Sequence, residues 1–176
     1  MRYRVGDVYR CLRLKSEQDA IALPQFEFVD RIPTVIDIAG FTRITQRAIE
    51  KVIRISRLPI ADWCARKQYD DEKRSFMHMY VEIEEEDESR SAINQQLIRE
   101  HMGIYFKHYD HDYNDLKRFL GVEPLQITLL KRGTLNEFSH RFGRRLSKIN
   151  PPQEDIINLL YIQNGERGRG GEGFCR

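Results

Sequence analysis

A carboxylate beside a glycine stands close to the start of the chain, in the segment Tyr3-Arg4-Val5-Gly6-Asp7. Gly6 lets the backbone turn tightly, because glycine has no Cβ atom. A carboxylate held next to such a turn can accept two hydrogen bonds from the vicinal hydroxyls of a ribose. The segment therefore fits a nucleoside site, although a Gly-Asp pair also commonly caps a turn before a strand.

Histidines and aspartates, which are residue types that bind metals, gather in one short stretch. They are His101, His108, His111, Asp110 and Asp112. The aromatic residues Phe106, Tyr109 and Tyr113 interleave them, and this mixture is typical of the rim of a helical hairpin. We therefore expect no metal site in this stretch.

A basic stretch near the C-terminus contains Arg141, Arg144, Arg145 and Lys148. It fits either a nucleic-acid surface or a solvated face. The chain has 29 Lys and Arg against 27 Asp and Glu, so its net charge is only +2, and an acidic run at residues 84–88 offsets the basic stretch. We therefore expect a solvated face and no binding to nucleic acid.

The composition is that of a globular protein, with 40% hydrophobic and 32% charged residues in a chain of 176. A chain of this length is expected to form one core, or one core with a small appendage. The three cysteines, Cys11, Cys64 and Cys175, have no metal-binding spacing and are expected to be reduced thiols. No apolar run approaches the roughly 18 residues of a membrane span, and no signal-peptide segment follows Met1. The prediction is a cytoplasmic protein that does not bind membranes.

Hydrophobic periodicity predicts the elements that must position these residues. Alternating patterns at residues 8–14 and 25–29 predict two strands that pair as an antiparallel ribbon. A third strand, at residues 34–39, stops at Gly40. Thr45 is then expected to cap an amphipathic helix.

The second half of the chain continues the alternation of strands and helices. Strands are predicted at residues 61–66, 76–83 and 124–130. Helices are predicted in the segment that ends near Phe106, at residues 112–120, and in a short segment that ends at Phe142 and has Thr134 as its cap. The order predicts an α+β fold: an N-terminal β-hairpin followed by a split βαββαβ sandwich, with helices on one face of a mostly antiparallel sheet. The glycine-rich residues 164–176 predict a disordered tail.

Several motifs occur in an order that indicates a family. They are the segment from Tyr3 to Asp7, Pro24-Gln25-Phe26-Glu27-Phe28-Val29-Asp30-Arg31, the helix at 46–51, and residues 123–127 running into 131–135. This series resembles the acyl-adenylate-forming superfamily and, more closely, the acyl-acid-amido synthetases, the plant auxin-conjugating family with its bacterial relatives. The resemblance covers about residues 2–150 and is specific as a series.

The resemblance implies which residues bind the nucleotide. The segment that contains Tyr3, Gly6 and Asp7 would hold the adenylate, with the Asp7 carboxylate on the ribose. Arg31 matches an arginine that supports the ribose or the phosphate.

The resemblance also implies a hinge and two catalytic cations. Ile32 and Pro33 occupy the hinge about which the small domain rotates between adenylation and acyl transfer, and the fixed φ of proline restricts that rotation. Plant members carry a lysine that reaches the nucleotide in this region, and Arg43 would substitute for it as a cation. Lys148 is the nearest match to a second family lysine, and it equally fits a solvated surface lysine.

The function implied is that of the C-terminal part of an ATP-dependent, AMP-forming ligase that adenylates a carboxylic acid and passes the acyl group to an amino acid. Residues 1–33 would be the hairpin and hinge of a large adenylating domain, residues 34–150 the small domain, and residues 151–176 a partly disordered tail. The partners would be that large N-terminal domain, a small-molecule acid and an amino acid. Mg²⁺ is expected in the complete enzyme.

The sequence contains no glycine-rich phosphate loop. We therefore expect the chain alone to bind ATP or AMP weakly or not at all, and not to turn over.

The alternative is a free-standing α+β ligand-binding or regulatory module. That reading predicts a self-sufficient dimer. The ligase reading instead predicts that Val8, Tyr9, Phe26 and Phe28 line a hydrophobic seam that a missing domain would cover.

Overall fold

The fold is known from a computed structural model, which describes residues 7–14, 23–31, 34–40, 42–84, 95–121 and 124–165. Tyr3, Gly6, Ile32, Pro33 and the tail from residue 166 onward lie outside the described residues. For Asp7 and Arg31 the backbone alone is described. The statements below concern the described part of the chain.

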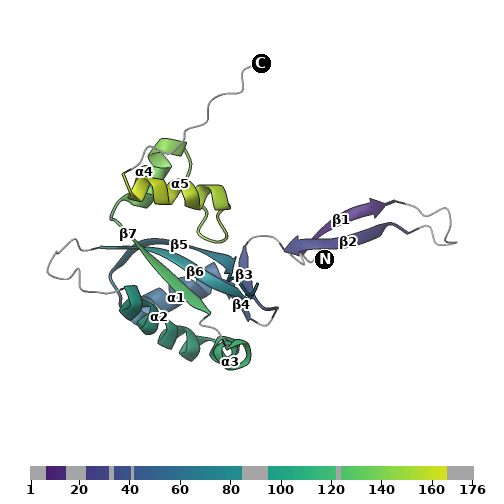
Figure 1. The fold of residues 1–176 in the computed structure, drawn as a ribbon, viewed down its shortest axis with the longest axis horizontal. Helices are drawn as coiled ribbons and strands as arrows, with labels where there is room; N and C mark the ends of the chain where they lie inside the picture. The colour runs from purple at the N-terminus through teal and green to yellow at the C-terminus, as the bar shows by residue number, and fades with distance from the viewer. Residues whose placement is uncertain are drawn as a thin grey trace, which may run out of the picture.

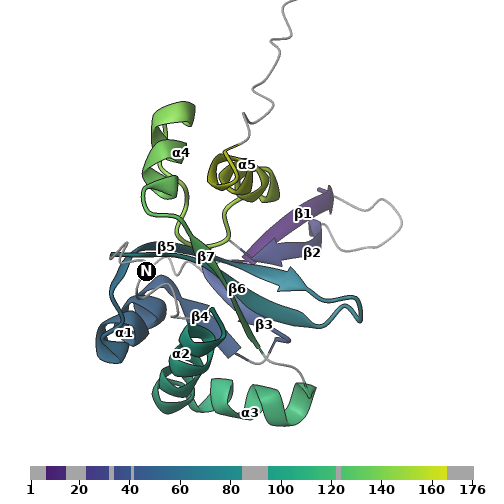
Figure 2. The ribbon, with the colours of Figure 1, turned by 60° about the vertical axis from the view of Figure 1, so that its left-hand side comes forward.

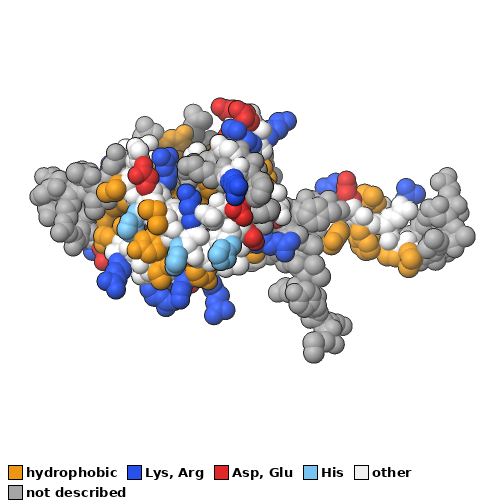
Figure 3. Space-filling model, turned by 90° about the horizontal axis from the view of Figure 1, so that it is seen from below, with side chains coloured by type: hydrophobic (Ala, Val, Ile, Leu, Met, Phe, Trp, Pro, Cys, Tyr) orange, Lys and Arg blue, Asp and Glu red, His pale blue; other side chains and the backbone are white. Residues whose placement is uncertain are grey.

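The predicted N-terminal ribbon is confirmed. Strand β1 (Asp7–Arg13) pairs antiparallel with β2 (Gln25–Arg31), and the hairpin stands apart from the rest of the fold (Figure 1). Tyr9 and Phe26 are both more than half exposed, as the predicted seam requires, while the side chains of Val8 and Phe28 are not described. Hydrophobic side chains are visible along this hairpin in Figure 3.

A three-stranded mixed sheet forms the centre of the molecule. Strand β5 (Ile60–Tyr69) pairs antiparallel with β6 (Ser75–Ile83), which confirms the predicted hairpin, and β6 pairs parallel with β7 (Leu125–Leu130). Strand β3 (Val35–Ile38) does not join this sheet. It pairs antiparallel with β4 (Thr42–Thr45), a strand that the sequence pattern did not predict, in a separate two-stranded ladder.

Helices cover both faces of the central sheet (Figure 2). On one face lie α1 (Gln46–Ser56), α2 (Gln95–Tyr109) and α3 (His111–Leu120), as the α+β prediction requires. On the other face lie α4 (Thr134–Phe142) and α5 (Gln153–Gln163). The helices within the predicted βαββαβ sandwich therefore lie on one face, as expected, whereas α4 and α5 follow β7 and lie outside it. Helix α5 lies in a segment that we assigned to the tail.

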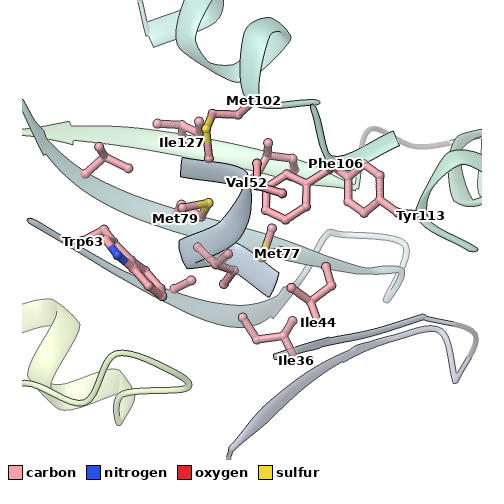
Figure 4. Packing of buried hydrophobic residues seen from close by; sticks show 14 of the residues in the cluster. Ile36, Ile44, Val52, Trp63, Met77, Met79, Met102, Phe106, Tyr113 and Ile127 are labelled. Atoms are coloured by element: carbon pink, nitrogen blue, oxygen red, sulfur yellow. The ribbon is translucent and has the colours of Figure 1, made fainter. Parts of the chain in front are cut away.

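The larger hydrophobic core fills the space between the sheet and the first three helices (Figure 4). Thr45 caps α1 as predicted, because its Oγ1 accepts a hydrogen bond from Ala48 N at 3.2 Å. Helix α2 buries Ile98, Met102 and Phe106, which are four residues apart and so lie on one helical face. Phe106 stacks on Tyr113 of α3 with ring centroids 5.1 Å apart, which joins α3 to the core.

A second hydrophobic cluster fixes α4 and α5 on the opposite face. The sheet contributes Cys64, Tyr80 and Leu130, and the helices contribute Leu135, Phe138, Ile156 and Leu159. This cluster determines the position of the connection between α4 and α5, residues 143–152, which carries Lys148.

Candidate functional site

The connection that carries Lys148, residues 143–152, is anchored at its start by an ion pair. The two terminal guanidinium nitrogens of Arg144, Nη1 and Nη2, donate to the buried carboxylate of Asp155, at 2.9 and 2.6 Å. The Asp155 carboxylate raises the pKa of Arg144, and the guanidinium also lies 5.6 Å from the ring centroid of Phe138. Arg144 is therefore part of the structural framework and not a freely solvated member of the basic stretch.

The middle of the same connection adds to the edge of the central sheet. Lys148 O accepts from Ala65 N and Asn150 N donates to Ala65 O, both at 2.8 Å, so Ile149 forms a parallel bridge with Ala65. The Asn150 side chain accepts from Lys67 N and donates to Val35 O, both at 2.9 Å. These four hydrogen bonds fix the chain from the Lys148 carbonyl to Asn150.

The Lys148 ammonium pairs with the carboxylate of Asp62 and lies 5.5 Å from the ring centroid of Trp63. The ladder between β5 and β6 is irregular between Ile60 and Asp62. Irregularities of this kind re-aim side chains and are frequent beside functional sites. Asp62 and Trp63 were not among the predicted site residues, since a strand pattern does not reveal a partner so far along the chain.

A cavity of about 320 Å³ opens beside this ion pair. Its lining carries both signs of charge together with amide, hydroxyl and apolar groups. The lining residues are Asp62, Trp63, Cys64, Glu82, Leu135, Asn136, Ser139, Arg145, Leu146 and Lys148. Burial raises the pKa of the Cys64 thiol to about 12, so this thiol is not a nucleophile at neutral pH.

Glu82 forms part of this lining and holds α4 in place. Its buried carboxylate accepts from Gly133 N at 3.1 Å and from Leu135 N at 2.5 Å. The prediction that Thr134 caps α4 was wrong, because Thr134 is the first residue of the helix and Gly133 is its N-cap. Gly133 has no side chain that could cap the helix. A carboxylate from a distant strand therefore satisfies the helix N-terminus and interacts favourably with its dipole.

A second cluster of polar residues lies on the same face of the sheet, around His78. Its Nδ1 lies 2.7 Å from Gln68 Oε1 and its Nε2 lies 2.8 Å from Thr128 Oγ1. Burial, together with the positive charge of Arg66, lowers the pKa of His78 to about 4. His78 is therefore a neutral structural residue at physiological pH and not an acid–base catalyst.

The predicted ribose clamp lies at one end of the β1–β2 hairpin. The register places Asp7 directly opposite Arg31, so the backbones of these two residues are cross-strand neighbours. Arg43 lies elsewhere, exposed on β4 and opposite Asp37, and it does not line the cavity beside Lys148. The structure therefore places the backbones of Asp7 and Arg31 side by side, and it places Arg43 outside the lining of the cavity that contains Lys148.

No group of three His, Cys, Asp or Glu side chains among the described residues is arranged to hold a metal ion. In the histidine-rich stretch, His101 Nε2 lies 3.0 Å from Ser56 O, the carbonyl of the last residue of α1. Within the described ranges, no helix combines the length and the hydrophobicity that crossing a bilayer requires.

Comparison with solved structures places this geometry in a known fold. The chain superimposes on the GH3.15 acyl acid amido synthetase with a TM-score of 0.50 and 20% identity, and the match covers 94% of this chain. The chain has the fold of the C-terminal part of an acyl acid amido synthetase. It spans 29% of the length of that enzyme.

Two further structures also match this C-terminal fold, at lower TM-scores. AtGH3.15 acyl acid amido synthetase in complex with 2,4-DB matches 90% of this chain and 30% of its own length, with 19% identity and a TM-score of 0.49. McyG A-PCP complexed with phenylalanyl-adenylate matches 90% of this chain and 23% of its own length, with 15% identity and a TM-score of 0.42. No protein-family model and no curated protein sequence matches the chain.

Proposed function

We propose that this chain is the C-terminal portion of an ATP-dependent, AMP-forming ligase that adenylates a carboxylic acid and transfers the acyl group to an amino acid. The observation that carries the proposal is the rung that pairs Asp7 with Arg31, within the fold of the C-terminal part of an acyl acid amido synthetase. A carboxylate and a guanidinium on one rung suit a nucleoside monophosphate, which offers a diol to the first and an anion to the second.

Each polar residue then has a separate task. Asp7 accepts hydrogen bonds from the ribose hydroxyls, and Arg31 supports the ribose or the phosphate. Lys148 supplies a second cation for the charge that develops on the phosphate when the acyl adenylate forms. Its fixed backbone supports this role, because an oriented cation costs less to position in the transition state than a mobile one. Arg43 is proposed as a further cation that approaches the nucleotide when the domains close.

Mg²⁺ is expected to enter with the phosphates of ATP, which is its usual mode of binding in such enzymes. The described residues offer no three-ligand metal site, so we assign no Mg²⁺ ligand to them. Because the sequence has no glycine-rich phosphate loop, we expect no acid-dependent release of pyrophosphate by the isolated chain.

Exposed hydrophobic side chains support the proposal that a large adenylating domain covers the hairpin. Leu12, Leu14, Leu23 and Phe26 are each more than half exposed, and they come from β1, β2 and the residues next to them. Exposed apolar side chains gathered on one hairpin are expected where another domain or chain buries them. The rival reading, a self-sufficient module, predicts instead that two copies cover each other, which sedimentation of the purified chain would detect.

A chimeric enzyme tests the proposed function. This chain would replace the matching C-terminal part of the GH3.15 acyl acid amido synthetase, and amide formation would be measured with the acid and amino acid that the unmodified enzyme uses. We expect the chimera to form amide faster than the large part of that enzyme alone. Equal rates from a chimera that is folded and binds ATP would contradict the proposal.

A further inference from the structure

We propose that Asp62 is a positioning residue for Lys148: it holds the ammonium in a docked position and competes for it with the anionic group that Lys148 must reach. This inference rests on the proposed function, because that function supplies the anion. It concerns the side chain of Lys148 only, since the Lys148 carbonyl and Asn150 are hydrogen-bonded to β5 and β3.

Asp62 is itself held in place, which a positioning residue requires. Its Oδ1 accepts from Trp63 N at 2.8 Å, and the same oxygen accepts from the Lys148 ammonium. The face of the indole ring borders the position of the ammonium on another side, with the ring centroid 5.5 Å away. The docked position is therefore defined by an oriented carboxylate and an aromatic face together.

The neighbouring acid cannot take over this task. Asp62 and Glu82 lie opposite each other on one rung of the β5–β6 ladder, where two carboxylates repel each other unless each has its own partner. Both Glu82 oxygens accept backbone hydrogen bonds from Gly133 and Leu135. Lys148 is thus the partner that compensates the charge of Asp62.

The pair is exposed enough to separate. The side chains of Lys148 and Asp62 are 36% and 43% exposed, so neither charge would be left buried when the ammonium leaves. Ion pairs of this exposure are weak and are readily exchanged for another anion. Lys148 can therefore move from Asp62 to a phosphate through rotation of its side chain, while the connection between α4 and α5 stays in place.

Trp63 allows a direct test, because it is the only tryptophan of the chain. The emission of the isolated chain would be compared for the unmodified protein, Asp62→Asn and Lys148→Met. Loss of the ammonium from the ring should change the emission of both variants in the same direction. Glu137→Gln, which breaks the similarly exposed Arg141–Glu137 pair, is the matched control and should leave the emission unchanged.

Inorganic pyrophosphate then serves as the probe anion, with Trp63 emission as the readout. Without its competitor, Lys148 in Asp62→Asn should bind pyrophosphate about fivefold more tightly than in the unmodified chain. The gain should vanish in Asp62→Asn with Lys148→Met, and Asp62→Glu should restore the original affinity. Circular dichroism would confirm that each variant is folded.

An Asp62→Asn emission spectrum identical to that of the unmodified chain would overturn the inference. A tighter pyrophosphate site that persists without Lys148 would also overturn it. The two proposals fail separately: an inactive chimera with an intact emission response removes the ligase function alone, whereas an active chimera with an unresponsive Asp62→Asn chain removes the role of Asp62 alone.

Discussion

The two faces of the central sheet differ in the side chains that they present and in the interactions that hold the helices on them. Toward α1 and α2, the strands present mainly apolar side chains, such as Met77, Met79 and Ile127, and these are fully or almost fully buried. Toward α4 and α5, the alternate residues of the same strands include polar side chains, among them Glu82 and His78, and each of these two is held by specific hydrogen bonds.

The difference shows how stability and chemistry are divided. The apolar face gains stability from the burial of area, which is non-directional and tolerates little polar substitution. The opposite, polar face combines the second hydrophobic cluster with directional bonds, and these bonds fix the start of α4 and the edge of β5, and hence Lys148. The predictions below test this division, from the largest expected effect to the smallest.

The apolar face should carry the largest single contribution. Phe106→Ala removes a fully buried ring that stacks on Tyr113, and leaves a cavity between α2 and α3. We expect the free energy of unfolding to fall by about 4 kcal/mol. Urea denaturation followed by circular dichroism would measure it. A loss below that of any change on the polar face would contradict the proposed division.

The polar face should depend on single hydrogen-bonding groups. Glu82→Ala removes the acceptor for two backbone N–H groups at the start of α4 and should cost about 3 kcal/mol. Protection of the α4 amides from hydrogen exchange should fall more than that of α2. If α2 and α4 lose protection equally, Glu82 does not act locally on α4.

Acid should weaken the polar face selectively. The folded pKa of His78 is about 4, below its ordinary value of 6.5, so the unfolded chain binds the proton more tightly between these values. The stability that neutral His78 provides is therefore lost as the pH falls from 6.5 to 4. The loss should be about 2 kcal/mol for a partly exposed ring.

Two single variants, His78→Gln and His140→Gln, would be compared, and His140→Gln is the control because His140 is exposed on α4. His78→Gln should flatten the dependence of unfolding free energy on pH in this window, and His140→Gln should leave it as it is. Equal slopes for the two variants would show that burial of His78 is not the cause.

Local sequence patterns were enough to predict much of this fold. The β1–β2 ribbon, the β5–β6 hairpin and the Thr45 cap of α1 all depend on residues close together in the chain, where periodicity and capping rules act. Helix α5 was missed although Ile156, Leu159 and Leu160 have helical spacing after Pro152 and acids occupy its first turn. That signal was available in the sequence.

The polar face could not be predicted in this way. Glu82 lies 53 residues from Leu135, and Asn150 lies 115 residues from Val35, so no local pattern links the partners. In the sequence, Glu82 is indistinguishable from a solvent-facing position of an alternating strand. The position of Lys148 could be predicted only as a family correspondence, and its partners Asp62 and Trp63 required the fold.

The central claim is that Asp7 and Arg31 form one nucleotide clamp in a ligase, and the rate of acyl-adenylate formation tests it most directly. In the chimeric enzyme, acid-dependent exchange of pyrophosphate into ATP would be compared for the unmodified chain, Asp7→Asn and the control Glu137→Gln. Loss of charge-assisted hydrogen bonds to the ribose should lower the rate about tenfold or more for Asp7→Asn and leave Glu137→Gln unchanged. An Asp7→Asn chimera that exchanges pyrophosphate as fast as the unmodified one would contradict the account.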